Sequence, residues 1–121
     1  MKSRIYISGP ISGLNRDECI AKFKDTQRML EDLGFEVFNP KENGLPEDAK
    51  THDHMRRDLS VLTNEENPFT HIFMMNHWTH SAGCWKEFET AVSCGIAVIF
   101  EEMSLEAGIK SVGKYCGVKF E

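Results

Sequence analysis

The chain has 121 residues, of which 40% are hydrophobic and 27% are charged, and these ordinary values exclude disordered and collagen-like classes. Its length predicts one domain, residues 1–121. The formal net charge of −5 argues against nucleic-acid polymers as partners, because such polymers bind basic surfaces. No apolar run is long enough to span a membrane, and the N-terminus lacks the apolar segment of a signal peptide. We therefore expect a cytoplasmic protein with no membrane partner.

The predicted elements alternate between strand and helix. The β-branched and aromatic run Arg4–Ser8 predicts a strand, and Asn15 begins a helix that is expected to end at residue 33. The run 35–38 predicts a second strand, which an Asn-Pro pair ends. The remaining expected elements are a helix at 54–63, a strand at 71–75, a helix at 82–94 capped by Ser81, a strand at 97–100, a short helix at 104–110 and a short strand at 117–120.

This order predicts the fold class α/β, with a parallel sheet of four to five strands covered by helices on both faces, which makes three layers. Ligands of such open sheets lie beyond the carboxyl ends of the strands. The loops that leave those ends are 8–13, 39–53 and 76–82. We expect the functional site there.

Four cysteines are spread along the chain without a Cys-x-x-Cys pair, namely Cys19, Cys84, Cys94 and Cys116. In a cytosolic domain of this size, they are expected to be small core residues rather than disulfides. Two pairs of loop histidines, His52 with His54 and His77 with His80, could imitate a zinc site together with Cys84. Their spacing matches no standard ligand pattern well, so we expect no metal and no cofactor.

Two acidic residues fall on faces that the helical period predicts to be apolar. Glu87 lies within the apolar arc of its helix, whereas Glu89 lies on the opposite side. Asp58 lies within the arc formed by Met55, Leu59 and Leu62. A buried carboxylate needs partners, so each acid has either a structural hydrogen bond or a chemical task. Paired carboxylates are the groups that perform glycosyl transfer.

Three motifs in the same order resemble the nucleoside 2-deoxyribosyltransferase superfamily. They are the runs Ile5–Gly13 (IYISGPISG), Met55–Leu59 (MRRDL) and Ser81–Glu87 (SAGCWKE). The chain is similar in particular to an uncharacterised small phage and bacterial branch, which is related to deoxynucleoside-monophosphate N-glycosidases. The resemblance implies a flavodoxin-like or Rossmann-like sandwich, a nucleoside or nucleotide as the small-molecule partner, and a homo-oligomer.

The resemblance also implies roles for individual residues. Glu87 takes the position of the family's nucleophile, at the matching spacing from Ser81 and Gly83. Asp58 takes the position of the acid that handles the base and its proton, and Tyr6 that of an aromatic that approaches the nucleoside. Since Glu87 must be ionised to attack, we expect it to accept hydrogen bonds, for instance from Tyr6 or from backbone N–H groups.

The loops contribute further candidates for substrate binding. Small side chains and N–H groups near helix N-termini suit a hydroxymethyl or phosphate group, and the candidates are Gly9, Pro10, Ser12, Gly13 and Ser81. The alternative is a tight turn that needs Gly and Pro. Trp78 is a candidate for stacking on a base, and the alternative is packing over the sheet edge.

Three functions stay open, and the weakest of them is a metal hydrolase that uses the loop histidines. The first is an enzyme that cleaves or exchanges the N-glycosidic bond of a nucleoside or its 5′-monophosphate. The second is a catalytically silent module that binds a nucleotide in the same pocket. The transferase branch has Asp where this chain has Ser81, and the hydrolase branch has Arg where it has Ser12, which favours the module. The presence of both Glu87 and Asp58 favours the enzyme.

Overall fold

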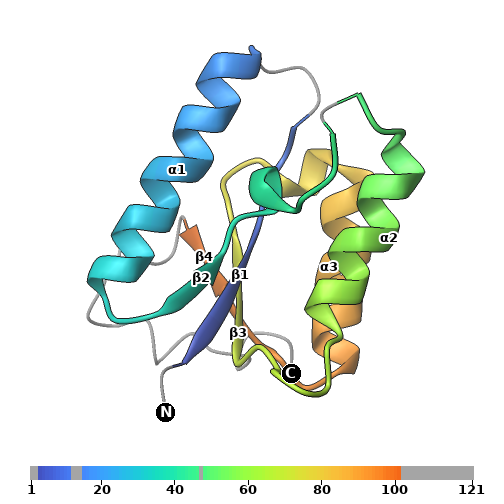
Figure 1. Ribbon diagram of the computed structural model, residues 1–121. Helices are drawn as coiled ribbons and strands as arrows, with labels where there is room; N and C mark the ends of the chain where they lie inside the picture. Colours follow the sequence, from blue (N-terminus) through green and yellow to red (C-terminus); the bar gives the residue numbers. More distant parts are fainter. Residues whose placement is uncertain (1–2, 12–14, 47, 102–121) are drawn as a thin grey trace.

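The computed structural model describes residues 3–11, 15–46 and 48–101 (Figure 1). The helices and strands, in chain order, are β1 (Arg4–Ser8), α1 (Arg16–Asp32), β2 (Glu36–Phe38), the 3₁₀ helix η1 (Pro40–Glu42), α2 (Thr51–Leu62), β3 (His71–Met74), the 3₁₀ helix η2 (Trp78–His80), α3 (Ala82–Ser93) and β4 (Ala97–Phe100). The short helix expected at 104–110 and the strand expected at 117–120 lie outside the described residues, as does Cys116.

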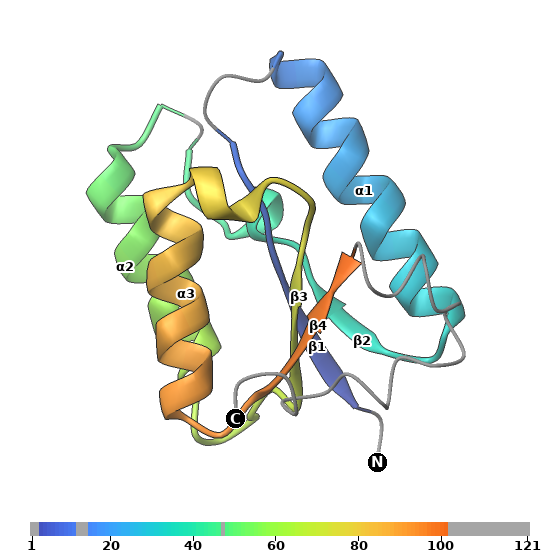
Figure 2. The same cartoon turned by 180° about the vertical axis from the view of Figure 1, so that it is seen from behind.

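The four strands form one parallel sheet in the order β2-β1-β3-β4. Helix α1 covers one face of the sheet, whereas α2 and α3 lie side by side on the other face, as both views show (Figures 1 and 2). The predicted three-layer α/β fold is therefore confirmed, and the strand order is that of the flavodoxin-like sandwich. In this order the connection reverses direction between β1 and β3, which is where such folds bind ligands.

Each face of the sheet has its own core. Ile5 and Ile7 of β1 pack with α1, whereas Tyr6 belongs to the cluster under α2 and α3. This follows from the alternation of side chains along a strand. Because Ser8 is two residues after Tyr6, it also faces α2 and α3, and it is fully buried.

Most helix ends lie where the sequence predicts them. The side chain of Asn15 accepts from two backbone N–H groups of α1, and Ser81 caps α3 through the N–H of Cys84. Helix α2 differs, since it begins at Thr51 rather than at the expected residue 54. Its N-cap residue Lys50 makes no side-chain cap bond, so no capping signal marked that start. No helix in the described part of the chain is long and apolar enough to cross a membrane.

The cysteine expectation was partly wrong. Cys19 and Cys84 are buried and free, as expected for core residues. Cys94 is also free but exposed, and it is the C-cap residue at the end of α3.

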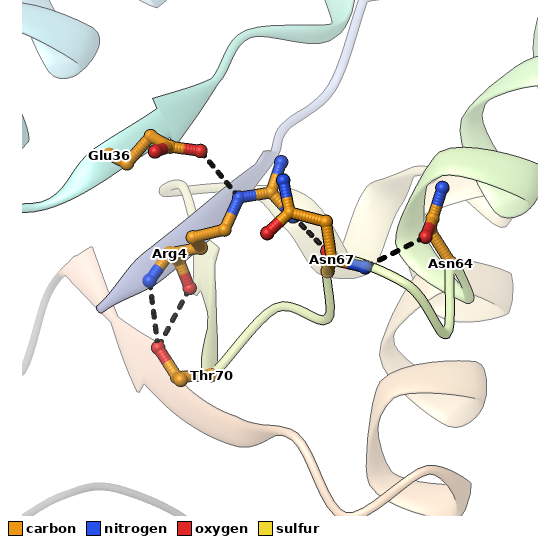
Figure 3. Close-up of polar contacts among 5 residues, drawn as sticks. All are labelled: Arg4, Glu36, Asn64, Asn67 and Thr70. Atoms are coloured by element: carbon orange, nitrogen blue, oxygen red, sulfur yellow. Dashed lines mark hydrogen bonds and ion pairs between the residues drawn. The ribbon is translucent and has the colours of Figure 1, made fainter. Parts of the chain in front are cut away.

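Arg4 joins three segments at the amino end of the sheet, the end away from the expected site (Figure 3). Its Nε lies 2.6 Å from a carboxylate oxygen of Glu36 in β2, and its guanidinium carbon lies 4.2 Å from the ring centroid of Phe69. The hydroxyl of Thr70 accepts from the backbone N–H of Arg4 and donates to its carbonyl, at 3.0 and 2.9 Å. These contacts hold β1 against β2 and the segment that enters β3.

Candidate functional site

Glu87 lies on the face of α3 that packs against the sheet, and only 6% of the residue is exposed. The hydroxyl of Tyr6 donates to its Oε2, and the hydroxyl of Ser8 donates to its Oε1 at 2.6 Å. Burial raises the pKa of Glu87 to about 7, although the Ser8 and Tyr6 hydrogen bonds counteract this rise. The site therefore holds a carboxyl group that is part ionised and part neutral near neutral pH.

Tyr6 is itself fully buried, between aromatic neighbours. Its ring stacks on Phe38 at 5.3 Å between centroids and meets Phe69 edge-on at 5.7 Å. Burial, and then the nearby charges of Glu87 and Asp58, raise the pKa of Tyr6 well above its ordinary value. The phenol therefore stays protonated and serves as a fixed hydrogen-bond donor to Glu87.

Asp58 lies on the inner face of α2 and is 7% exposed. Its Oδ1 accepts from the side-chain amide of Asn43 at 2.9 Å. Burial raises the pKa of Asp58, and the Asn43 hydrogen bond, the charge that His54 carries when its ring is protonated, and the charge of Arg57 oppose that rise. The buried position that the helical pattern predicts for this acid, like that of Glu87, is confirmed.

The two acids interact electrostatically. Helices α2 and α3 pack against each other, and the charge of Asp58 contributes to the raised pKa of Glu87. Buried carboxyl groups with raised pKa values, one of which opposes the ionisation of the other, are typical of acid–base machinery. Structural networks also shift pKa values, so the geometry of the surrounding pocket has to support a chemical role.

A pocket of about 520 Å³ opens beyond the carboxyl ends of β1 and β2, between α1 and α2. Its walls are formed by Ile11, Ile20, Lys24, Asn39, Pro40, Lys41, Glu42, Asn43, Leu45, Ala49, Thr51, His54 and Asp58. This volume lies in the range of small-molecule sites. Asp58 is part of the wall, whereas Glu87 and Tyr6 are not among the residues that line the pocket.

The glycines and Ser81 of the predicted site have packing or capping roles. A Cβ built on Gly9 would lie 2.5 Å from the sulfur of Met75, so the chain passes too close to the core for a side chain there. A Cβ on Gly83 would lie 3.0 Å from the terminal methyl of Met55. Ser81 caps α3, and Pro10 is half-buried just after Gly9. The substrate contacts predicted for these residues stay predictions.

Trp78 lies in an aromatic cluster beside β4 rather than in the pocket wall. Its ring centroid lies 4.6 Å from that of Trp85, 5.0 Å from that of Phe88 and 5.8 Å from that of Phe100. The structure thus brings Glu87, Tyr6 and Asp58 together but does not bring Trp78 to them. Ser12 and Gly13, the other predicted loop residues, lie outside the described residues.

The sequence analysis did not find three features of the site. These are the hydrogen bond of Ser8 to Glu87, that of Asn43 to Asp58, and the place of His54 in the pocket wall. Ser8 had a signal, because strand alternation places it on the same face as Tyr6. Asn43 had none, since it is one polar residue in a polar loop. His54 was weighed only as a metal ligand. Within the described residues, no group of three His, Cys, Asp or Glu side chains could hold a metal ion.

One comparison with known proteins places the chain in a family. Residues 3–100 match a family described as a domain of unknown function, DUF4406. No curated protein matches the chain. The matched range contains all three sequence motifs, both buried acids and the pocket. The chain belongs to the DUF4406 family.

Proposed function

We propose that the protein cleaves or exchanges the N-glycosidic bond of a nucleoside or its 5′-monophosphate through a glycosyl ester on Glu87. One observation carries the proposal: a buried carboxyl group on α3 accepts from Tyr6 and Ser8, and a second buried carboxyl group, Asp58, lies on the neighbouring helix and in the pocket wall. The resemblance of the three motifs to the nucleoside 2-deoxyribosyltransferase superfamily supports the same reaction.

The reaction proceeds in two steps. An ionised oxygen of Glu87 attacks C1′ of the sugar, the C1′–N bond breaks, and its electron pair goes to the base nitrogen. Asp58 in its protonated form supplies a proton to the leaving base. Water then cleaves the ester and restores both acids, or a second base attacks C1′ and transfer results. The hydroxyls of Tyr6 and Ser8 hold Glu87 in place and stabilise its negative charge.

Access to Glu87 follows the seam between α2 and α3. Gly83 and Met55 lie about one helical turn before Glu87 and Asp58, and the methyl of Met55 fills the space over Gly83. Methionine is flexible, and the proposed reaction requires that Met55 rotate away so that substrate reaches Glu87 along this seam. Each oxygen of Glu87 has a second lone pair left for the sugar, because each accepts one hydroxyl.

The test is the chromatographic release of free base from deoxyribonucleosides, ribonucleosides and their 5′-monophosphates, with and without an acceptor base. Glu87→Gln is expected to abolish release. Glu89→Gln is the matched control, since Glu89 is an exposed carboxylate on the same helix, and it is expected to keep wild-type rates. A dependence on acceptor base separates transfer from hydrolysis. Release that survives Glu87→Gln would overturn the nucleophile assignment.

A second candidate, a catalytically silent nucleotide-binding module, is favoured because the buried Glu87 is not among the residues that line the pocket. A folded protein that binds a nucleotide in calorimetry but releases no base from any substrate would establish this alternative.

The proposal also places the protein in the cytoplasm as a homo-oligomer. Light scattering during gel filtration tests the oligomer, and cell fractionation tests the compartment.

A further inference from the structure

One buried amide contacts two polar side chains of the pocket wall, Asp58 and His54. The Nδ2 of Asn43 lies 2.9 Å from Oδ1 of Asp58 and 3.1 Å from Nδ1 of His54. Asn43 is 7% exposed, and Asn43, His54 and Asp58 all line the pocket. The orientation of this amide therefore determines what the pocket presents to a ligand.

The hydrogen bonds around Asn43 fix that orientation. Its Oδ1 accepts from the backbone N–H of Leu45 at 3.1 Å, so Nδ2 faces the other way, toward Asp58 and His54. A flipped amide would place Oδ1 against the carboxylate and Nδ2 against an N–H group, and both contacts would be repulsive. The guanidinium of Arg57 donates to the backbone carbonyl of Asn43 at 2.7 Å, which anchors the residue.

The tautomer of His54 follows from this arrangement. An amide nitrogen donates and does not accept, so Nδ1 of His54 has to accept, and the ring proton lies on Nε2. Among the described residues, none accepts from Nε2 of His54 and none donates to Oδ2 of Asp58. As far as the described residues go, the pocket wall therefore carries one donor and one acceptor without a protein partner, on the same helix and one turn apart.

The apolar part of the pocket wall suits a flat ring, whereas Lys24, Lys41 and Glu42 make another part of the wall charged. Ile11 and Ile20 line it and are 49% and 38% exposed, although large apolar side chains gain stability when covered. Leu45 and Ala49 add further apolar surface. A nucleobase has this combination of apolar faces and an edge with neighbouring donors and acceptors.

We infer that this pocket is the subsite for the leaving base, in which His54 donates from Nε2 to a ring acceptor, Asp58 contacts the adjacent ring or exocyclic nitrogen, and Asn43 is the positioning residue for both. The inference rests on the proposed function. It adds two residues, His54 and Asn43, that select the base without touching the sugar.

A first test does not depend on activity. Long-range ¹H–¹⁵N spectra of the histidine rings are expected to show His54 with its proton on Nε2 in the free protein. Asn43→Ala removes the donor to Nδ1 and is expected to convert His54 to a mixture of tautomers, with the fold monitored by the other amide signals. A proton on Nδ1, or a spectrum that Asn43→Ala leaves unchanged, would overturn the positioning role.

The second test measures binding of adenine, hypoxanthine, cytosine and thymine as free bases, together with KM and kcat for the nucleosides that are turned over. Gln places a donor near the position of Nε2, so His54→Gln is expected to keep base affinity within about threefold. His54→Leu removes one hydrogen bond and is expected to weaken affinity about tenfold and to raise KM more than it lowers kcat. His52→Leu is the control, since His52 is an exposed residue of α2 outside the pocket wall.

The outcomes separate this inference from the proposed function. If the wild-type protein binds bases in a His54-dependent way but releases none from nucleosides, the subsite stands and the glycosidic reaction is wrong. If nucleosides are turned over but His54→Leu and His54→Gln change neither base affinity nor KM, the reaction stands and the subsite assignment is overturned. No binding of any base at millimolar concentration also overturns the subsite.

Discussion

The hydroxyl of Tyr6 and the carboxyl group of Glu87 connect strand β1 to helix α3. Both groups are buried. Glu87 helps to raise the pKa of Tyr6, whereas the hydrogen bond from Tyr6 lowers the pKa of Glu87. Strand β1 therefore supplies a hydrogen-bond donor that stabilises the ionised form of Glu87 in a buried site. Ser8, two residues later, supplies the second donor.

Removing either donor is expected to move the pH dependence of turnover. Tyr6→Phe and Ser8→Ala each remove a hydrogen bond that lowers the pKa of Glu87, so this pKa rises above about 7. Since the attack needs the ionised form, the pH at which kcat/KM reaches half its maximum moves upward, and kcat/KM at pH 7 falls about tenfold. Phe38→Leu is the control, because it removes the stacking on Tyr6 but keeps the hydroxyl. An unchanged pH profile in both donor variants would contradict this account.

Glu87→Gln is expected to stabilise the protein at high pH. In the unfolded chain the pKa of Glu87 is 4.5, and in the folded protein it is about 7, so the folded state binds the proton more tightly. Wild-type stability therefore falls as the pH rises from 4.5 to about 7, by about 3 kcal/mol for this group, and stays lower above pH 7. Gln resembles the protonated acid and avoids that loss.

Urea unfolding of wild type and Glu87→Gln between pH 4 and pH 9 measures the difference. The two proteins are expected to have similar stability at pH 4, and the variant is expected to be more stable at pH 8. Glu89→Gln, at an exposed position, serves as the control and is expected to show no such trend. If the difference in unfolding free energy between wild type and Glu87→Gln does not grow with pH, burial does not destabilise the ionised form of Glu87.

The sequence predicted the fold because each strand and helix carries its own local signal. The apolar runs at β1, β3 and β4, the caps Asn15 and Ser81, and the short connections together leave few arrangements other than a parallel sheet between helices. The start of α2 was wrong by three residues because Lys50 gives no cap signal.

The acids of the site were predictable for a related reason. The helical period predicts apolar residues on the inner face of each helix. Asp58 and Glu87 are acidic residues on those faces, and both are buried. Asn43 could not be predicted, because its role depends on how a polar loop folds back onto α2, and no periodicity describes that path. For Trp78 the sequence left two alternatives open, and the ring packs beside the edge strand β4, which is the second of them.

Asp58→Asn is expected to impair departure of the base. The Asn side chain keeps an oxygen that accepts from Asn43 but cannot supply the proton, so kcat is expected to fall by about 10² to 10⁴ for bases that leave as neutral molecules. Substrates whose leaving group departs readily as an anion, such as p-nitrophenyl 2-deoxyribosides, are expected to lose much less. Equal losses for good and poor leaving groups would remove Asp58 from the role of proton donor.

Gly9 is expected to be required for stability more than for binding. A Cβ at this position would lie 2.5 Å from the sulfur of Met75 and 3.1 Å from the ring of Phe23, and both of those side chains are almost fully buried. Gly9→Ala therefore forces a shift in the core under α1 and is expected to cost about 1–3 kcal/mol. Thermal unfolding measures this cost without any ligand.

Gly83→Ala is the matched comparison, because the new Cβ would meet only the mobile end of Met55 at 3.0 Å and the Ser81 hydroxyl at 3.7 Å. Its expected stability cost is below about 1 kcal/mol, since the methionine can rotate away. Because the same methyl lies over the seam to Glu87, this variant is expected to change kcat/KM more than stability, the reverse of Gly9→Ala. Equal stability losses in the two variants would show that the seam is as rigid as the core and that substrate does not reach Glu87 by this path.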